Sequence, residues 1–146
     1  MKNATKLAGA LAILMALSAA PASAQGFGWR ARYENSVTVT QTGHRNGSAV
    51  AQSGRGNDGV VNQRGNDNTG IVQQSGNANT AGIRQVGQNL SGTITQTNSG
   101  NNACLVQAGN GVTTNITQNG GETTNIIATP GTTRRISPLL AARLCR

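Results

Sequence analysis

The chain has 146 residues, a formal net charge of +8, and only one Trp, one Tyr and one Phe. Gly, Asn, Gln, Thr and Ser dominate most of its length, so it has too little large apolar surface for an ordinary globular core. Such a composition alone would indicate disorder, but a strict spacing of glutamines argues against that interpretation.

Residues 1–24 are typical of a secretory signal peptide. Lys2 and Lys6 give a positive start, residues 7–17 form a short apolar run, and residues 22–24 (Ala-Ser-Ala) resemble a cleavage site. The apolar run is too short to span a bilayer as a helix. We therefore expect secretion, which leaves a mature chain with ten Arg, no Lys, four acids and a charge of +6.

The sequence divides into four predicted segments. These are a signal peptide (1–24), a pre-repeat segment (25–36), a repeat region (37–128) and a basic C-terminal tail (129–146).

The repeat region has a period of eleven residues. A glutamine returns at every eleventh position, an aliphatic residue stands two positions before each glutamine, and a glycine stands two positions after all but one of them. The glutamines are Gln41, Gln52, Gln63, Gln74, Gln85, Gln96, Gln107 and Gln118. The aliphatic residues are Val39, Val50, Val61, Val72, Ile83, Ile94, Leu105 and Ile116. The glycines are Gly43, Gly54, Gly65, Gly76, Gly87, Gly109 and Gly120, with Asn98 as the exception. Eight copies in phase indicate a repeat architecture.

Each unit predicts one strand and one arc. The small, aliphatic and glutamine positions are two apart, so in a strand they share one face. The predicted strands lie near 37–42, 48–53, 59–64, 70–75, 81–86, 92–97, 103–108, 114–119 and, more weakly, 125–128. The arcs open with Gly and are centred on Asn46, Asn57, Asn68, Asn79 and Asn101. Gly and Asn accept the positive φ that a tight reversal needs.

Two strands and two arcs make one coil of about 22 residues, a length typical of the repeats of solenoid proteins. The sequence therefore predicts an all-β fold, a parallel two-sheet β-solenoid of cross-β type with coils about 4.8 Å apart. Alternate strands stack, so each sheet contains a ladder of four glutamines. A buried amide is costly unless it is bonded, and in a ladder each amide donates to one neighbour and accepts from the other.

The repeat resembles the Gln-x-Gly-x-x-Asn-x-Ala-x-x-x-Gln signature of the curlins, the secreted subunits of bacterial curli amyloid. Residues 41–52 carry it, 63–74 and 74–85 follow it closely, and 107–118 follow it less well. The resemblance implies export through the periplasm and a dedicated outer-membrane pore. It also implies association with itself and with other curlins in a cell-surface fibre (fimbrium) that serves adhesion and the biofilm matrix.

The chain resembles the minor, nucleating curlin in its even repeat spacing, its basic charge and its arginine-rich end. A major, fibre-forming curlin is the alternative. The tail arginines are Arg134, Arg135, Arg143 and Arg146. Pro130 and Pro138 remove ladder donors, so we expect the tail to leave the stack. The arginines indicate either attachment to an anionic cell-surface polymer or an end that is merely solvated.

The two cysteines suggest a disulfide, because an oxidising compartment favours one. Cys104 falls at an outward position of its strand, and Cys145 is next to last. The hypothesis is that the tail folds back onto the coil. Bridges between chains and two free thiols are the alternatives.

No catalytic, metal or cofactor site is expected. His44 is the single histidine, the four acids are scattered, and no nucleophile elbow, phosphate loop or zinc spacing occurs. Specific nucleic-acid binding is not expected either, because no aromatics interleave with the basic residues. The charged repeat residues, Arg45, Arg55, Arg64, Arg84, Asp58 and Asp67, fit gatekeepers against sideways stacking or simple solubility.

Two non-nucleating alternatives remain. One is a passive matrix protein; the other is a monomeric β-solenoid that binds ice or polysaccharide, which would need a regular outward array. The threonines around Thr38 and those around Thr93 are separated by five repeat units, each a half-coil, so they fall on opposite sheets. The sequence therefore disfavours the binding module.

Overall fold

A computed structural model describes residues 13–17 and 34–145 of the chain. The described part contains eleven strands and one helix. The strands are β1 (Ile13–Leu17), β2 (Ser36–Thr42), β3 (Gly47–Ser53), β4 (Asp58–Asn66), β5 (Thr69–Ser75), β6 (Thr80–Gln88), β7 (Ser91–Thr97), β8 (Asn102–Asn110), β9 (Thr113–Asn119), β10 (Thr123–Thr129) and β11 (Thr132–Arg135). The helix is α1 (Pro138–Leu144).

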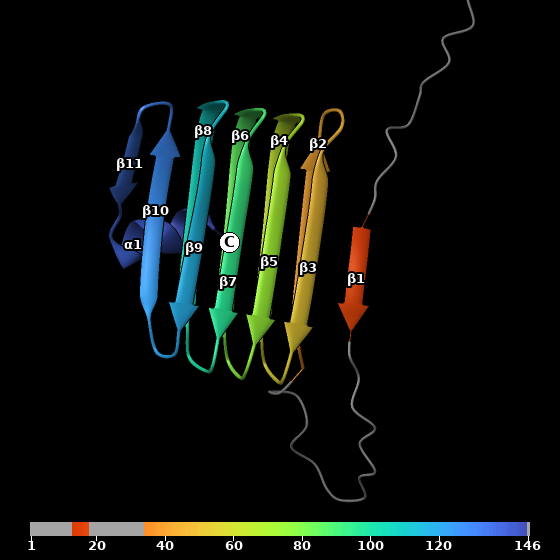
Figure 1. Ribbon diagram of the computed structural model, residues 1–146, viewed down its shortest axis with the longest axis vertical. Helices are drawn as coiled ribbons and strands as arrows, with labels where there is room; N and C mark the ends of the chain where they lie inside the picture. Colours follow the sequence, from red (N-terminus) through yellow and green to blue (C-terminus); the bar gives the residue numbers. More distant parts are fainter. Residues whose placement is uncertain (1–12, 18–33, 146) are drawn as a thin grey trace, which may run out of the picture.

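The strands alternate between two facing sheets (Figure 1). Sheet A has the order β1-β3-β5-β7-β9, and sheet B has the order β11-β10-β8-β6-β4-β2. Every pairing is parallel except that of β10 with β11. The predicted two-sheet β-solenoid is confirmed, with about four turns of about 22 residues and one short helix besides.

The eleven-residue period sets the register. Paired strands are offset by two repeat units along the chain. Val39 therefore lies beside Val61, and Gln41 beside Gln63, within the same sheet. Burial alternates along strands such as β3 and β5, as expected when one face of a sheet is buried. In β8 the outward Cys104 and Val106 are buried as well, because they pack with Ala141 of the C-terminal helix. The aliphatic positions form the core between the sheets: Val50, Val61, Val72, Ile83, Ile94, Leu105 and Ile116 are buried, and Val39 in the first coil is partly buried.

From Gly43 to Gly87, the glycine two positions after each ladder glutamine is required by the close approach of the next coil. Gly65 has φ +125°, and a Cβ at this position would overlap the carbonyl oxygen of Gly87 in the next coil. L residues rarely adopt this φ, and the coil spacing leaves no room for a side chain.

Our reason for the arc asparagines was wrong. The left-handed residue precedes the asparagine in each arc; in three arcs it is Arg45 (54°), Asp67 (58°) or Ala78 (56°). The arc asparagines themselves have no positive φ. Their side chains instead form hydrogen bonds between successive coils.

The C-terminal region also differs from expectation. The ninth coil strand, β10, is a full seven-residue strand, not the short element predicted at 125–128. A turn at Pro130 and Gly131 (φ 75°) then reverses the chain, and β11 pairs antiparallel with β10. The prediction that the tail leaves the stack is therefore wrong for β11, because Pro130 lies in the turn, where no ladder donor is needed.

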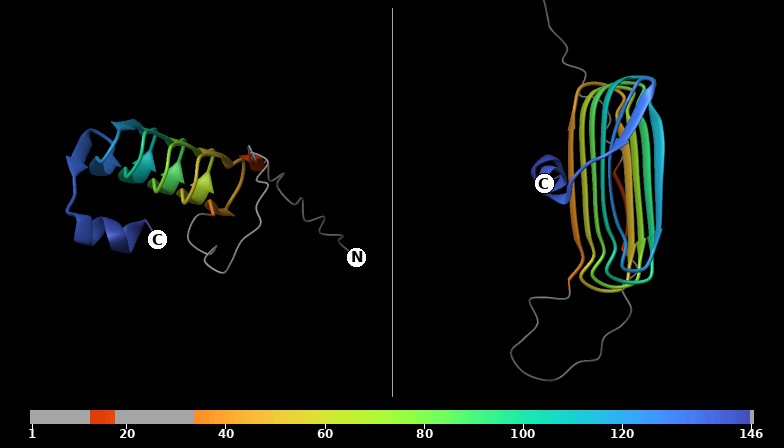
Figure 2. Two further views of the ribbon diagram at one scale, coloured as in Figure 1. Left: turned by 90° about the horizontal axis from the view of Figure 1, so that it is seen from below. Right: turned by 90° about the vertical axis from the view of Figure 1, so that its left-hand side faces the viewer.

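Helix α1 does leave the stack and lies over the outer face of sheet B (Figure 2). Ser137 caps it by accepting a hydrogen bond from the N–H of Leu140, and Pro138 occupies its first turn.

Most of the predicted signal peptide and pre-repeat segment lies outside the described residues. Residues 13–17 form β1, which pairs parallel with β3 from Ile13 opposite Ser48 to Leu17 opposite Gln52. None of the helices in the described ranges is long and apolar enough to span a membrane. Cleavage and secretion stay predictions.

Candidate functional site: the amide ladders and the tail

Two ladders of glutamine amides run through the coil, one in each sheet. In sheet B the Nε2–Oε1 distances are 2.6 Å from Gln41 to Gln63, 2.7 Å from Gln63 to Gln85 and 2.7 Å from Gln85 to Gln107. In sheet A they are 2.8 Å from Gln52 to Gln74, 2.9 Å from Gln74 to Gln96 and 2.7 Å from Gln96 to Gln118. In each bond the lower-numbered residue donates. All of these glutamines are buried except Gln41, which is half-buried.

A second bond fixes the direction of each ladder. Gln85 Nε2 also donates to the backbone oxygen of Thr69 across the coil at 2.8 Å, and the same contact recurs from Gln52 to Gln118. Because a carbonyl oxygen can only accept, this contact identifies the nitrogen end of the amide. A ladder amide thus donates twice and accepts once, and a leucine there would leave these partners unsatisfied.

The arc asparagines form further ladders. Asn57 Oδ1 accepts the backbone N–H of Asn79 at 3.1 Å, and its Nδ2 donates to the carbonyls of Ser53 and Gly76 at 3.1 and 2.9 Å. Asn79 Oδ1 accepts the N–H of Asn101 in the same way, at 3.0 Å. Each asparagine therefore ties its own arc to the arc of the next coil.

One member of this set, Asn35, is not among the asparagines predicted from the sequence. Asn35, one period before Asn46, accepts the N–H of Asn57 at 3.0 Å and donates to Gly54 O at 3.1 Å. The eleven-residue spacing was the signal that could have identified it. The arcs on the opposite side of the coil carry Asn46 and Asn68, followed by Leu90 and Val112 in place of further asparagines. Leu90 and Val112 are buried against Ala128.

Among the described residues, the central outward row of each sheet is chemically mixed. On sheet B, Thr38, Val60, Gly82 and Cys104 are neighbours in register. On sheet A, Ala49, Ile71, Thr93 and Asn115 are neighbours. These mixed rows offer no repeated chemistry to an ice lattice or an extended polysaccharide.

Comparison with known families assigns the repeat. Residues 34–65 and 65–97 match the model of the curlin associated repeat. The chain belongs to the curlin family. The ladders continue beyond the matched residues, through β8 and β9. The curlin repeat and the β-solenoid fold are structural, and they support a structural subunit of the curli type. No curated protein sequence matches the chain significantly.

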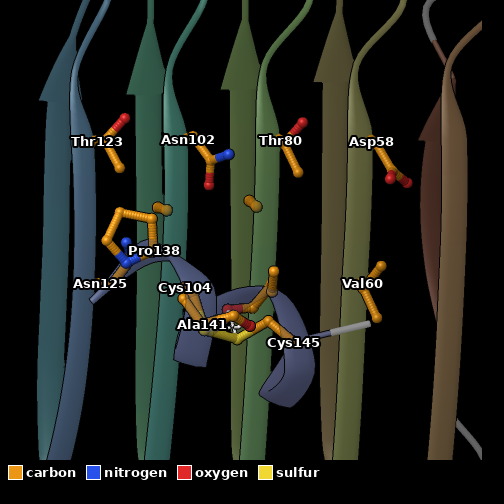
Figure 3. Close-up of a pocket in the computed structure, with 14 residues that line it drawn as sticks. Asp58, Val60, Thr80, Asn102, Cys104, Thr123, Asn125, Pro138, Ala141 and Cys145 are labelled. Carbon is orange, nitrogen blue, oxygen red and sulfur yellow. Dashed lines mark hydrogen bonds between the residues drawn. A yellow bond between two sulfur atoms is a disulfide. The ribbon is translucent and has the colours of Figure 1, made fainter. Parts of the chain in front are cut away.

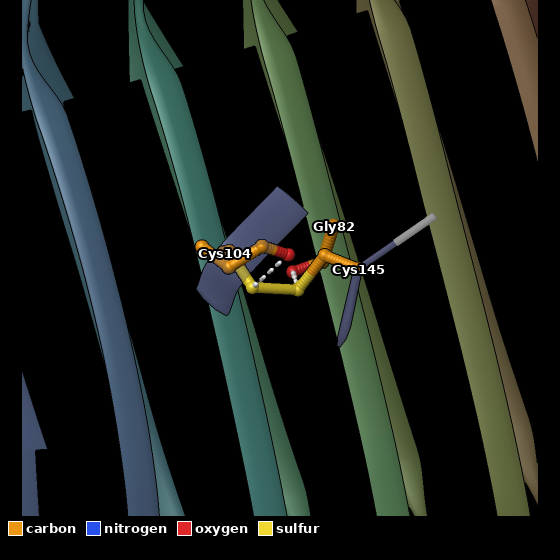
Figure 4. The surroundings of a disulfide bond; sticks show 4 residues. Gly82, Cys104 and Cys145 are labelled. Carbon is orange, nitrogen blue, oxygen red and sulfur yellow. Dashed lines mark hydrogen bonds between the residues drawn. A yellow bond between two sulfur atoms is a disulfide. The ribbon is translucent and has the colours of Figure 1, made fainter. Parts of the chain in front are cut away.

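A disulfide ties the tail of this curlin to the coil (Figure 4). It joins Cys104, on the outer face of β8, to Cys145, with a Cα–Cα distance of 5.9 Å. The sulfurs lie 3.8 Å from Ala141 O and 3.6 Å from Gly82 O. Disulfide sulfurs carry no proton, so these are packing contacts. Among the alternatives considered for the cysteines, the structure has the bond within one chain.

A cleft of about 310 Å³ separates α1 from sheet B (Figure 3). Asp58, Thr80, Asn102 and Thr123, neighbours in register, line its sheet side. Asn125 also lines it, and its buried Oδ1 has no hydrogen-bond partner. Within residues 13–17 and 34–145, no three His, Cys, Asp or Glu side chains gather as metal ligands, and His44 is exposed on an arc.

The charged arc residues make one ion pair. Arg45 contacts Asp67 in the next coil through Nε–Oδ1 at 2.5 Å and Nη2–Oδ2 at 2.7 Å. This hydrogen bonding lowers the pKa of Asp67 and raises that of Arg45. Arg55 and Arg64 are exposed, and Arg84 is half-buried on the outer face of sheet B.

The tail arginines lie on two elements. Arg134 and Arg135 are exposed on β11, and Arg143 is exposed in the last turn of α1. Arg146 lies outside the described residues.

Proposed function

We propose that this curlin is a secreted subunit of a curli-type amyloid fibre on the cell surface, in the minor, nucleating role, and that the fibre serves adhesion and the biofilm matrix. The two unbroken glutamine ladders support the amyloid role most directly. Any chain with the same repeat can add a coil to such a ladder with the same bonds. The basic charge and the arginine-rich end favour the minor over the major subunit.

The ends of the coil explain why assembly is expected. A sheet edge presents unpaired N–H and C=O groups, and an open parallel edge can pair with another chain. Few charged side chains interrupt the inner faces, so such pairing would continue the core.

The test is amyloid-dye kinetics of the purified secreted protein, alone and as a small seed added to a major curlin. We expect a shorter lag of the major curlin and fibres with the two cross-β reflections, at about 4.7 Å and about 10 Å. A folded, dye-negative monomer that leaves the lag unchanged would contradict the proposal.

Processing is a separate part of the proposal. We expect the chain to pass through the periplasm and the curli outer-membrane pore and to begin at Gln25. Mass spectrometry of protein stripped from the cell surface measures the N-terminus directly. An intact Met1, or protein found only inside the cell, would contradict this route.

We also propose that the tail attaches the fibre to an anionic polymer of the cell surface through Arg134, Arg135, Arg143 and Arg146. Replacing the four arginines by glutamine should leave fibre formation unchanged and lower the fraction of fibres retained on washed cells. Replacing Arg55 and Arg64, which are exposed on the coil, provides a control for charge alone. Equal retention of the wild type and the tail variant would indicate an end that is only solvated.

A further inference from the structure

The two ends of the coil differ in their hydrogen bonding. In the described part, three buried side-chain polar atoms lack a partner, and two of them, Ser48 Oγ and Gln52 Oε1, are on β3 at the N-terminal end. Ser48 is 8% exposed and Gln52 is 5% exposed. The third, Asn125 Oδ1, lies in the cleft beneath α1. With β1 paired to β3, Ser48 Oγ and Gln52 Oε1 have no hydrogen-bond partner, and a further coil of the ladder would supply a donor to Gln52 Oε1.

The C-terminal ends of the ladders are already satisfied. The last amide in sheet B, Gln107, turns its second N–H to the backbone oxygen of Val112 at 3.2 Å. The last amide in sheet A, Gln118, donates to Glu122 O at 3.1 Å. In every ladder bond the glutamine nearer the N-terminus donates. A spare acceptor oxygen therefore remains at the N-terminal end of the ladders, and the C-terminal end has no spare amide donor.

The tail also closes the C-terminal edge of sheet B. Strand β11 pairs antiparallel with residues 126–129 of β10, and the N–H of Ile136 donates to Asn125 O at 2.9 Å. A Cβ at Gly109 would lie 2.7 Å from Pro130 Cδ, where the other glycines of this column meet the carbonyl of the next coil. Only β9, in sheet A, has no strand beyond it in the described part at this end.

Strand β1 shows what the N-terminal edge accepts. Its five residues pair parallel with β3, on the side away from β5. Removal of residues 1–24, which the sequence predicts, would free this edge of β3 in the secreted chain.

We infer that this curlin joins a fibre through one end only: the edges of β2 and β3 receive the last coil of a second curlin-repeat chain in parallel register, and a glutamine amide of that coil donates to Gln52 Oε1. This inference rests on the proposed function and makes it specific. The occupant is a subunit whose final coil is uncovered, such as a major curlin. A copy of this chain offers only β9 of sheet A, because the C-terminal edge of its sheet B is covered by the antiparallel β11.

The test compares two lysine variants at matched positions. In the secreted chain, from which β1 would be removed, Ser48→Lys and Thr114→Lys each place a charge at the small inward position of an edge strand of sheet A, β3 at one end and β9 at the other. An inward charge at an edge opposes pairing with a further strand. Circular dichroism and a thermal scan establish that both variants fold.

Two readouts follow when each protein is mixed with a purified major curlin. Amide exchange by mass spectrometry reports docking, and the lag of dye binding reports nucleation. With the wild type we expect β2 and β3 to gain protection and the lag to shorten. Both effects should be lost in Ser48→Lys and retained in Thr114→Lys.

The outcomes separate the two proposals. Protection of β2 and β3 without a shorter lag would support the inference and contradict the nucleating role. A shorter lag with protection at β9 or β11, or equal loss in the two variants, would overturn the inference and leave nucleation standing. No new protection at any strand overturns the inference, and an unchanged lag in addition contradicts the nucleating role.

Discussion

The repeated coils and the tail of this curlin are held together in different ways. From β2 to β9, nearly every stabilising contact is made again one coil later: a parallel strand, a glutamine bond, an asparagine bond and a glycine against a carbonyl. The tail uses contacts that occur once, namely a proline turn, a capped helix and a disulfide. Periodic contacts leave a structure open to extension, whereas unique contacts end it.

The sharpest way to break the coil is to add one methyl group between two of its turns. Gly65→Ala would meet both the positive φ and the carbonyl of Gly87, so we expect a loss of about 3 kcal/mol or more in the free energy of unfolding. Gly47→Ala is the control, because nothing lies within 4 Å of that Cβ. Chemical denaturation measures both, and equal midpoints would contradict the close approach of the coils.

Replacing a glutamine inside a ladder should lower the free energy of unfolding by less, because it removes hydrogen bonds without forcing the coils apart. Gln85→Leu leaves the Nε2 of Gln63 and the Oε1 of Gln107 each without one partner, and we expect a loss of about 2–3 kcal/mol. The matched change Gln73→Leu, on the exposed face of β5, should stay within about 0.5 kcal/mol. Comparable losses in the two variants would show that the ladder contributes little.

Removing the disulfide distinguishes the tail from the coil. In Cys104→Ser/Cys145→Ser we expect fast amide exchange over α1, while the strands keep their circular dichroism and nearly their midpoint. Were tail and coil one cooperative unit, a bridge spanning 41 residues would be worth about 4 kcal/mol to the whole. A loss of that size in the coil midpoint would refute the separation of the two regions.

The smallest effect concerns the charges on the arcs. Arg45→Ala should raise the pKa of Asp67 toward its ordinary value, because it removes the hydrogen bonds that lower it. A depressed carboxyl pKa stabilises the fold above the usual aspartate range and loses that contribution as the pH falls through the folded value. Carboxyl NMR titration measures the shift; Arg55→Ala, on another exposed arc, should leave the pKa of Asp67 unchanged.

The coil could be predicted from sequence because its physics is periodic. Alternation by two assigns each residue to a face, and the period of eleven assigns each strand to a sheet and a register. The ladder geometry followed from the cost of burying an amide. The arc asparagines show the limit of such reasoning: the positions were correct, but composition suggested backbone conformation where the structure has side-chain hydrogen bonds.

The tail could not be predicted in the same way. Prolines indicated an end to the stack, yet Pro130 sits in a turn that returns a strand to it, and Pro138 starts a helix. Leu90 and Val112 occupy the place of an arc asparagine, and they form the surface on which Ala128 packs. Each of these features depends on one partner distant in sequence and on no period.

The alternation of strands between sheets has a consequence for how such genes can change in length. Duplicating a single repeat unit between β9 and β10 would transfer the tail to sheet A, on the opposite side from Cys104, and separate the cysteines. Duplicating any number of units before β8 moves Cys104 and the tail together and keeps them on the same sheet. Descendants of this chain that retain the clamp should therefore vary in repeat number before β8 and keep a single strand between β8 and β10.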